Sequence, residues 1–530
     1  MHEDKNCKNV IFVLSYYINK YKNIEEDLER GKQPGSDMEE TMAALGDLLK
    51  EVSYECVRGT VERDITDVIY DSRKVVEGSL FVCIPGAKAD GHKFAADAVR
   101  AGAAALLTEH EVELPEGADV TVIRVADVRY AFAFVSAAYF GHPAQRMKII
   151  GITGTKGKTT TTYLVKSILE QAGRKVGLIG TIEIIIGETH IHAENTTPQS
   201  YLVQKYFRMM ADAGCDTVVM EVSSQGLMLH RTQGFVFDFG IFTNLEPDHI
   251  GENEHKDFDD YLQCKSLLFR QCRVGIVNRD DSHWEAVTKG CTCQLETYGI
   301  DTPADLRAED IAFLNEGGSL GMRFTAKGLV ELSVQIASPG RFNVYNALTA
   351  IAICRHFGVD GKAVQNALAA AKVKGRTEMV KVSDEFTLMI DYAHNAMALK
   401  SLLGTLRAYN PHRLVCLFGC GGNRAKSRRY EMGEVSGRMA DLTIITSDNP
   451  RTEEPQAIID DIKTGIAKTD GKYVEICDRK EAIAYAIDHG EPGDIIVLAG
   501  KGHEDYQEIN GVKYPMDERV LIQEILEERA

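Results

Sequence analysis

Lys158 and Thr159 follow a glycine-containing loop, and residues 151–160 read GITGTKGKTT. An apolar run precedes this segment and a helical pattern follows it, so we expect a loop between a strand and a helix. Glycines there let backbone N–H groups turn toward an anion, and the helix N-terminus adds partial positive charge. The lysine can then reach a β- or γ-phosphate, and the threonine hydroxyl can bind Mg²⁺. These residues predict a nucleoside triphosphate site.

The spacing of this loop departs from the general phosphate-loop template. That template places a glycine five residues before Gly157, where this chain has Ile152. The glycine here is Gly154, which gives a tighter GTxGKT form. A plain glycine-rich turn is the alternative, and the lysine and two threonines after Gly157 disfavour it.

Glu221 lies at the end of a predicted strand at 217–222, among valines and a methionine. A triphosphate site of this type needs a carboxylate on a neighbouring strand to hold Mg²⁺. A glutamate buried there is costly without a cation or partner, although a surface or capping glutamate is the alternative. His249, in TNLEPDH, could also bind metal, but a loop histidine taken alone usually does not. For Lys265, on an apolar-faced helix, composition alone predicts a solvated side chain.

Three polar loops follow predicted strands in the last third of the chain. They are GCGGNR at 419–424, SDNPR at 447–451 and AGKGHED at 499–505. In open α/β sheets, ligands bind outside the carboxyl ends of the strands. We therefore expect these loops to surround one crevice.

Short strands alternate with helices along the chain, which predicts an α/β protein of three domains. We expect an extension at 1–40, a small α/β domain at 41–145, a central domain at 146–374 and a C-terminal domain at 375–530. Near-continuous apolar strands in the central domain predict a parallel sheet covered on both faces. They lie at 147–153, 176–179, 217–222, 237–243 and 274–277. The C-terminal domain is expected to be Rossmann-like, with strands at 387–391, 414–418, 442–446 and 494–498.

Composition excludes several classes of protein. The 530 residues suit three domains, and 44% apolar residues suffice for their cores. A net charge of −18 disfavours broad nucleic-acid binding. The twelve cysteines include no CxxC pair at zinc spacing, which predicts reduced thiols and a cytoplasmic location. No stretch reaches the roughly 18 apolar residues that would span a bilayer.

The N-terminus contains a short apolar run at 10–18 that mimics a signal peptide. It includes Ser15, Tyr16 and Tyr17, and no small-residue cleavage site follows. We interpret residues 1–40 as an extension of unknown role, because the globular pattern begins at Leu45.

A series of motifs occurs in the order found in the Mur ligases. They are GTKGKTT, NTTP, EVSSQGL with a following arginine, TNLEPDH, YLQCKSLLF, NRDD, GRFNVYN, GR at 375–376, DYAHNAMAL, GCGGNR and GKGHEDYQ. Each motif alone is weak to moderate, but the set is highly specific and covers residues 45–520. The chain therefore resembles the Mur ligases over nearly its whole length. Within that family it is similar to the MurE type, which adds the third amino acid to a UDP-N-acetylmuramoyl dipeptide.

The resemblance implies an ATP and magnesium site. Lys158 would contact the phosphates and Thr159 would bind Mg²⁺. The implied ATP-binding residues are Gly154, Thr155, Lys156, Gly157, Lys158, Thr159, Thr160, Asn278, Arg376 and Asp391. Glu221, His249 and Lys265 would join Thr159 around the metal, with Lys265 carbamylated by CO₂ into a carboxylate-like ligand. The implied catalytic residues are Lys158, Lys265, His249 and Arg376.

The resemblance also implies a site for the UDP-sugar peptide. Its residues would be Ser72, Ala87, Lys88, Ala89, Asn195, Thr196, Thr197, Ser223 and Arg231. Two features depart from the family: Leu229 stands where a glutamine is often found, and IGENEHKDF replaces the usual aspartate-tyrosine-histidine run after Asp248-His249. These differences concern individual contacts and not the class of enzyme.

The incoming amino acid is expected to bind in the C-terminal domain. DNPR resembles the MurE enzymes that use meso-diaminopimelate, and Arg451 can clamp the distal carboxylate that lysine lacks. Lysine-adding relatives have a different residue there, and a plain Asn-Pro turn is the alternative interpretation. Asp448 or Glu504 would hold an ammonium group, Arg424 a second carboxylate, and Gly500 would permit close approach. The implied set is Arg424, Asp448, Asn449, Pro450, Arg451, Gly500 and Glu504.

The reaction implied is ATP-dependent amide formation in cytoplasmic peptidoglycan precursor synthesis. The D-glutamyl carboxylate would take the γ-phosphate, and the amine of diaminopimelate would then displace phosphate. The alternatives are the same reaction with L-lysine or another diamino acid, a folate polyglutamylating ligase, a P-loop switch or motor protein, and an inactive homologue. We expect UDP-N-acetylmuramoyl dipeptide and diaminopimelate as ligands, no nucleic-acid or membrane partner, and a monomer.

Overall fold

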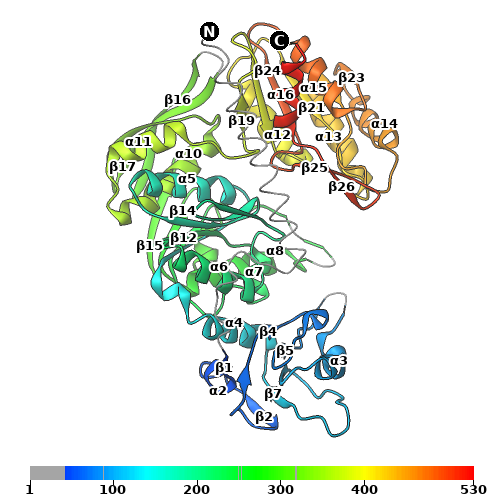
Figure 1. Ribbon diagram of the computed structural model, residues 1–530. Helices are drawn as coiled ribbons and strands as arrows, with labels where there is room; N and C mark the ends of the chain where they lie inside the picture. Colours follow the sequence, from blue (N-terminus) through cyan, green and yellow to red (C-terminus); the bar gives the residue numbers. More distant parts are fainter. Residues whose placement is uncertain (1–41, 87–88, 249, 252–253, 317–318, 530) are drawn as a thin grey trace, which may run out of the picture. The chain divides into compact units, whose positions relative to one another are not determined.

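The computed structural model describes residues 42–529 except 87–88, 249, 252–253 and 317–318. The extension predicted at 1–40 thus lies outside the described residues. The chain forms two compact units, one up to Pro143 with Ser200–Met209, and the other comprising Ala144–Gln199 and the chain from Met210 onward. Figure 1 labels the elements of both units.

The first unit contains a five-stranded sheet in the order β2-β7-β6-β5-β4. Its strands are β2 (Glu55–Arg58), β4 (Val68–Ile69), β5 (Leu80–Val82), β6 (Ala105–Thr108) and β7 (Thr121–Arg124). All are parallel except β2, and α3 (Ala95–Arg100) and α4 (Val128–Tyr139) complete the unit. Leu80, Leu107 and Phe132 belong to its core. The small α/β domain expected from the sequence is present.

The second unit contains an eleven-stranded sheet with a parallel centre. The parallel strands are β8 (Lys148–Thr153), β9 (Val176–Ile179), β12 (Thr217–Glu221), β13 (Phe237–Phe242), β14 (Cys272–Asn278), β15 (Gln294–Gly299) and β16 (Leu306–Glu316). In the register, Glu221 of β12 lies opposite Ile152 of β8, and Thr153 lies opposite Phe242 of β13. The predicted parallel sheet is confirmed, and its strands end side by side around the loop at 154–157.

Antiparallel strands that the sequence did not predict extend this sheet at both edges. They are β10 (Glu183–Ile186) and β11 (Thr189–His192) at one edge, and β17 (Ser319–Gly328) and β18 (Leu332–Ile336) at the other. In β17, Met322, Phe324 and Ala326 are buried and alternate with less buried residues. This alternation is typical of antiparallel strands with one solvent-exposed face, and it differs from the apolar runs of the parallel strands.

Helices cover both faces of the sheet. On one face α5 (Lys158–Gln171), α10 (Arg341–Cys354) and α11 (Gly361–Ala370) pack together (Figure 1). On the other, Leu268 and Phe269 of η4 (Leu267–Arg270), which follows α8 (Phe258–Ser266), lie against glycines of β13 and β14. At the end of α5, Gly173 follows the C-cap Ala172 and has φ of 82°, the left-handed conformation that glycine adopts without strain.

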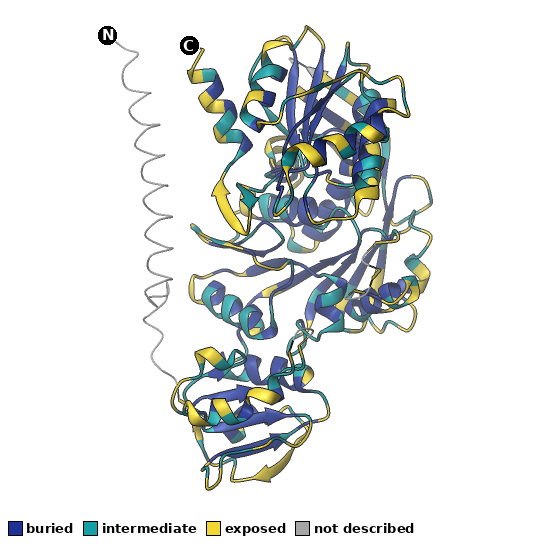
Figure 2. Ribbon diagram, turned by 90° about the vertical axis from the view of Figure 1, so that its right-hand side faces the viewer, coloured by how far each residue is buried: buried dark blue, intermediate teal, exposed yellow. Residues whose placement is uncertain are grey.

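The second unit also contains a six-stranded sheet in the order β19-β20-β24-β21-β22-β23. Its strands are β19 (Glu378–Val380), β20 (Thr387–Asp391), β21 (Leu414–Phe418), β22 (Leu442–Ile445), β23 (Tyr473–Glu475) and β24 (Ile495–Ala499). Helices α12 (Ala396–Arg407), α13 (Lys426–Met439) and α14 (Pro455–Ile466) pack on one core, and α15 (Arg479–Asp488) and α16 (Glu518–Glu527) on another. A hairpin of β25 (Tyr506–Ile509) and β26 (Val512–Pro515) precedes α16. Figure 2 shows the buried strands between helices with exposed outer faces, as in a Rossmann-like fold.

Close packing of α13 on α14 generates a stability prediction. A Cβ added to Gly433 would lie 2.2 Å from the Ile462 carbonyl oxygen, a backbone atom that cannot move freely. We expect Gly433→Ala to lower the free energy of unfolding by about 1–3 kcal/mol, as overpacking does. Chemical denaturation followed by circular dichroism measures this change.

Gly404→Ala is the matched control, because a Cβ there meets its nearest atom, Met439 Cε, at an ordinary 3.6 Å. Alanine is the better helix former by about 1 kcal/mol, so this variant should be neutral or slightly more stable. Equal destabilisation by both substitutions would contradict the packing described.

Candidate functional site

The predicted phosphate loop connects β8 to α5 and depends on two glycines. Gly154 has φ of 146°, and a Cβ there would lie 1.9 Å from Thr243 Oγ1. Gly157 has φ of 85°, and a Cβ would lie 2.5 Å from Asn346 Oδ1. Other residues are strained at such φ values. The displaced glycine of the sequence is therefore required by the closely packed loop at 243–244.

Two lysine side chains meet at one carbonyl oxygen of this loop. Lys158 Nζ donates to the Gly154 oxygen at 2.8 Å, and Lys265 Nζ donates to the same oxygen at 3.0 Å. Lys265 is 1% exposed, and its ammonium lies 4.5 Å from the centre of the Tyr261 ring. The prediction from composition that Lys265 is solvated is thus wrong. Lys265 lies beside the phosphate loop, where the family resemblance implies a functional residue.

The surroundings of the two lysines lower both of their pKa values. Burial lowers the pKa of Lys158, although Glu221 opposes the shift. Burial and the nearby Lys158 lower the pKa of Lys265 well below the usual value for lysine. A neutral amine is nucleophilic, so Lys265 is suited to reaction with an electrophile.

Glu221 is 1% exposed and fully engaged at the end of β12. Its Oε2 accepts from the Thr159 hydroxyl at 3.0 Å and from the Thr181 hydroxyl at 3.1 Å, and its Oε1 accepts from the Thr181 N–H at 2.8 Å. The structure therefore brings together the predicted carboxylate and hydroxyl. Both are hard oxygen donors of the type that Mg²⁺ prefers, so these residues fit the ion. The third predicted ligand, His249, lies outside the described residues.

The predicted peptide-binding residues of the second unit adjoin Glu221. Thr197 Oγ1 donates to the Glu221 carbonyl and accepts from the Ser223 N–H, and Arg231 donates to the Thr197 carbonyl at 2.9 Å. Thr196 Oγ1 lies 3.0 Å from Thr181 Oγ1, while Asn195 is exposed. The predicted Ser72 and Ala89 belong to the first unit, and Ala87 and Lys88 lie outside the described residues.

A buried histidine missed by sequence reasoning links two helices of this region. His255 is 0% exposed, with its Nδ1 3.0 Å from Asp260 Oδ2 and its Nε2 2.8 Å from Ser224 Oγ. Ser224 opens α7 (Ser224–Met228) and Asp260 lies in α8, the helix of Lys265. Ser224 is buried, so this serine–histidine–aspartate set holds helices together and exposes no nucleophile. The altered segment IGENEHKDF contained His255, but no sequence spacing indicated its partners.

Three further predicted residues lie at strand ends and in the adjoining loop. Asn278 ends β14, and its Nδ2 donates to the Thr243 carbonyl at 2.9 Å. Asp391 ends β20, accepts from the Thr377 and Ala393 N–H groups, and has its pKa raised by burial. The Arg376 guanidinium lies over the Tyr392 ring at 4.6 Å and contributes repulsion at Lys158.

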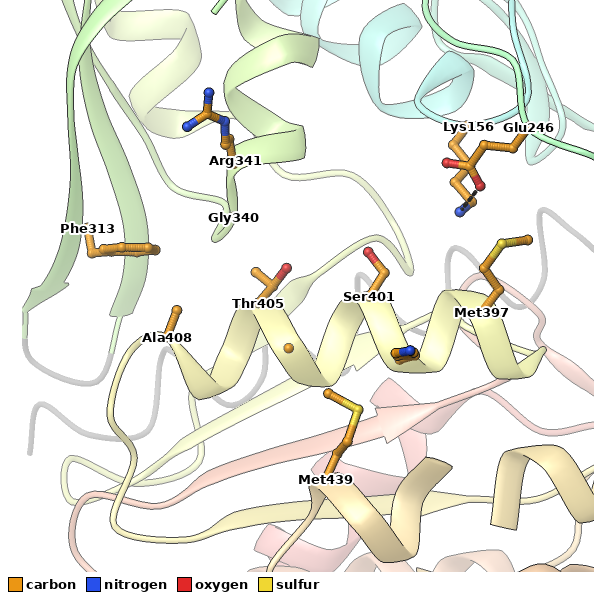
Figure 3. A pocket seen from close by; sticks show the side chains of 12 residues that line it. Lys156, Glu246, Phe313, Gly340, Arg341, Met397, Ser401, Thr405, Ala408 and Met439 are labelled. Carbon is orange, nitrogen blue, oxygen red and sulfur yellow. Dashed lines mark hydrogen bonds and ion pairs between the residues drawn. The ribbon is translucent and has the colours of Figure 1, made fainter. Parts of the chain in front are cut away.

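A cavity of about 730 Å³ adjoins the phosphate loop. Its lining includes Lys156, paired with Glu246 at 2.6 Å, and the Gly340-Arg341 start of α10. Figure 3 shows Met397, Ser401 and Thr405 of α12 lining the opposite side. Such a volume accommodates a small ligand beside the phosphate loop.

The predicted amino-acid loops do lie together at the carboxyl ends of β21, β22 and β24. Lys501, which the sequence did not single out, is 0% exposed and donates to Asn449 Oδ1 and Glu504 Oε2, both at 2.9 Å. Asn449 Nδ2 donates to the same Glu504 oxygen at 2.9 Å. Gly500 has φ of 107°, and its absent Cβ leaves room beside Asp448. This network fixes Asn449 and Glu504 without using Glu504 Oε1.

The two predicted arginines differ in their surroundings. Arg451 donates through Nε to Glu508 and through Nη1 to the Gly422 carbonyl. A Cβ on Gly422 would lie 1.9 Å from the Pro450 oxygen, so the loops at 419–424 and 447–451 touch directly. Arg424 is exposed.

Comparison with known proteins assigns the chain to a family. The models "Mur ligase family, catalytic domain", "Mur ligase middle domain" and "Mur ligase, glutamate ligase domain" match residues 64–140, 152–354 and 375–502. The chain belongs to the Mur ligase family. In the part that the structure describes, no helix is long and apolar enough to cross a membrane.

Similar proteins share one description. The UDP-N-acetylmuramoyl-L-alanyl-D-glutamate–2,6-diaminopimelate ligase of Clostridium perfringens is 40% identical over 91% of this chain and 99% of its own length. The enzyme so described from Caldanaerobacter subterraneus is 42% identical over the same shares. A solved structure with this description is 27% identical and has a TM-score of 0.68, covering 92% of this chain and 99% of that one. MurF from Acinetobacter baumannii, 19% identical with a TM-score of 0.61 over 92% and 99%, shares the fold.

His503, near Arg376, generates a pH prediction. Burial, aided by Arg376, lowers its pKa to about 3, and its Nδ1 is buried without a protein partner among the described residues. An unfolded histidine titrates near pH 6.5, so between about pH 6.5 and 3 the unfolded chain binds the extra proton. Stability is therefore lost as pH falls from about 6.5, by up to about 1.4 kcal/mol per unit. Between pH 7 and pH 5, the free energy of unfolding of the wild type should fall by about 1–2 kcal/mol more than that of His503→Asn. Urea denaturation at both pH values measures this difference.

The exposed His489→Asn is the control and should keep the wild-type acid response. If His503→Asn also lost stability as steeply as wild type, the buried neutral histidine would be contradicted.

Proposed function

We propose that this chain joins meso-2,6-diaminopimelate to UDP-N-acetylmuramoyl-L-alanyl-D-glutamate with hydrolysis of ATP to ADP and phosphate. Relatives of this description match essentially their whole length, at 40–42% identity. The structural observation that carries the proposal is that a GTxGKT loop and a DNPR loop both occur in the second unit. The first suits a triphosphate, and the second presents an arginine suited to a distal carboxylate.

In this proposal each domain carries one substrate. Residues 41–145, with Ser72 and the loop at 87–89, bind the uridine end, and Asn195, Thr196, Thr197, Ser223 and Arg231 bind the peptide. Residues 146–374 bind ATP, with Asn278 at the nucleotide. Arg376 and Asp391 approach the nucleotide from the following domain. The cavity lined by Lys156 adjoins this site. Residues 375–530 bind the amino acid.

The first chemical step transfers a phosphoryl group. The D-glutamyl carboxylate attacks the γ-phosphorus, the bond to the β-phosphate oxygen breaks, and ADP leaves. Lys158 and the N–H groups of the loop offset charge on the phosphate oxygens. Thr159 and Glu221 would hold Mg²⁺, with His249 and modified Lys265 as further ligands, and the ion would neutralise phosphate charge.

The second step forms the amide. Asp448 and Glu504 hold the ammonium of one end of the amino acid, while Arg451 and Arg424 bind carboxylates. The reacting amine attacks the acyl carbon after losing its proton, and the tetrahedral intermediate expels phosphate. Fixed donors hold the amine close to the acyl carbon, and this orientation favours its attack.

Lys265 is proposed to carry a carbamate. Its neutral amine forms a bond to the carbon of CO₂ and loses a proton, so a buried neutral group becomes an anion beside Lys158. The lowered pKa and the repulsion from Lys158 both favour this change. The new oxygens match the hard donors Thr159 and Glu221.

Removal of this amine tests its role. We expect Lys265→Ala to lower ligation at least about 100-fold, and added formate or acetate to restore part of it by supplying the missing carboxylate. Phosphate release coupled to product formation measures both effects. Lys166→Ala, which removes a partly buried lysine paired with Glu170 on α5, should retain wild-type activity. Unchanged activity of Lys265→Ala would contradict the carbamate, and absence of ligation by wild type would indicate an inactive homologue.

The amino-acid substrate is tested by phosphate release with the UDP-dipeptide and either meso-diaminopimelate or L-lysine. We expect kcat/KM to favour diaminopimelate by at least about 100-fold, because Arg451, already held in place by Glu508 and Gly422, would lack a carboxylate partner with lysine. If lysine is used equally well or better, the amine substrate is lysine and not diaminopimelate. Failure to bind the UDP-dipeptide would favour a folate-type ligase, and ATP hydrolysis independent of any acceptor would favour a switch or motor protein.

A further inference from the structure

Arg451 occupies a backbone conformation that few residues adopt. Its φ is 54°, in the left-handed region, although it is not glycine. Such a conformation persists where the surrounding structure holds it, and it is concentrated at functional sites. The elements that hold Arg451 therefore determine where its side chain points.

The hairpin of β25 and β26 supplies the backbone restraint. The Arg451 N–H donates to the Glu508 carbonyl at 3.0 Å, and the Asn510 N–H donates to the Arg451 carbonyl at 2.7 Å. These two bonds place Arg451 beside Ile509 as an isolated parallel bridge. The DNPR loop is thus attached to the hairpin at the arginine itself.

Two nitrogens of the Arg451 guanidinium donate hydrogen bonds to neighbouring residues. Its Nε donates to Glu508 Oε2 at 3.1 Å and its Nη1 to the Gly422 carbonyl at 2.6 Å. Glu508 is fixed in turn, because its own N–H donates to Asn449 Oδ1, the acceptor that also binds buried Lys501. The side chains of Arg451 and Glu508 are 24% and 26% exposed, so the pair borders solvent. No other acceptor among the described residues bonds the guanidinium, so Nη2 and the second N–H of Nη1 remain available.

We propose that Glu508 is a specificity-determining positioning residue that aims the Nη edge of Arg451 at the distal carboxylate of the incoming diamino acid. This inference rests on the proposed function. An arginine side chain has several rotatable bonds, and ordering it only on binding weakens affinity. Glu508 orders it beforehand and occupies the Nε edge, so a carboxylate is received bidentately at the opposite end. Glu508 itself contacts no substrate.

The test is a double-mutant cycle of Glu508→Ala and Arg451→Ala, with steady-state constants for each substrate. We expect Glu508→Ala to raise KM for meso-diaminopimelate about tenfold while kcat and KM for ATP change less than about twofold. In the Arg451→Ala background the same substitution should add less than about twofold, because Glu508 acts through the arginine. KM for L-lysine, used as a poor substrate, should not change.

Conservative and surface variants complete the test. Glu508→Gln retains an acceptor for Nε and should keep KM for diaminopimelate within about threefold of wild type. Glu434→Ala removes an exposed glutamate paired with Arg438 at 2.9 Å in the same domain and should have no effect. If circular dichroism shows that Glu508→Ala has lost its fold, Glu508→Met, which keeps the side-chain stem, takes its place.

Two results would overturn the inference. One is a KM for diaminopimelate that is unchanged, lowered, or raised in parallel with KM for ATP. The other is a full effect of Glu508→Ala in the Arg451→Ala background. Wild-type enzyme that prefers lysine would instead overturn the proposed function itself, and this is seen before any substitution is made.

Discussion

The carbonyl oxygen of Gly154 accepts hydrogen bonds from Lys158 and from the buried Lys265, and this shared acceptor joins the phosphate loop to α5 and α8. Two charged ammonium groups at one oxygen would repel each other, and this repulsion together with burial lowers the pKa of Lys265. Glu221 lies near Lys158 but is already bonded to Thr159 and Thr181. Lys158 and the N-terminal end of α5 therefore remain to meet an anion supplied from outside, which suits a phosphate.

The proposed amino-acid site in the six-stranded sheet differs, because the partners of its buried cation come from the protein itself. Lys501 is fully buried, and Asn449 and Glu504 accept its hydrogen bonds. A satisfied buried network is rigid, whereas a partly satisfied one is costly. In the proposed site, rigid polar groups at three strand ends hold the loop of Arg451, and an amine without the distal carboxylate leaves that arginine without its partner.

The sequence predicted those features that follow from local chemistry. Glycine spacing located the phosphate loop, apolar runs located the parallel strands, and a carboxylate in an apolar strand located Glu221. It did not predict β17 and β18, whose alternating pattern is weaker than a continuous apolar run. Nor did it find His255, Lys501 or Glu508, because their partners are distant in sequence and come together when loops pack. Lys265 was found through family resemblance, since burial of a lysine is a tertiary property.

In the proposed reaction the γ-phosphate is passed to a peptide carboxylate before the amide forms. The most direct measurement uses UDP-N-acetylmuramoyl-L-alanyl-D-glutamate labelled with ¹⁸O in its glutamyl side-chain carboxylate, and mass spectrometry of the phosphate released during ligation. The account predicts one ¹⁸O atom in each phosphate, because the carboxylate oxygen bridges to phosphorus and stays with it when the amine attacks. Phosphate without ¹⁸O would show that water or another group receives the phosphoryl group, and would contradict the account.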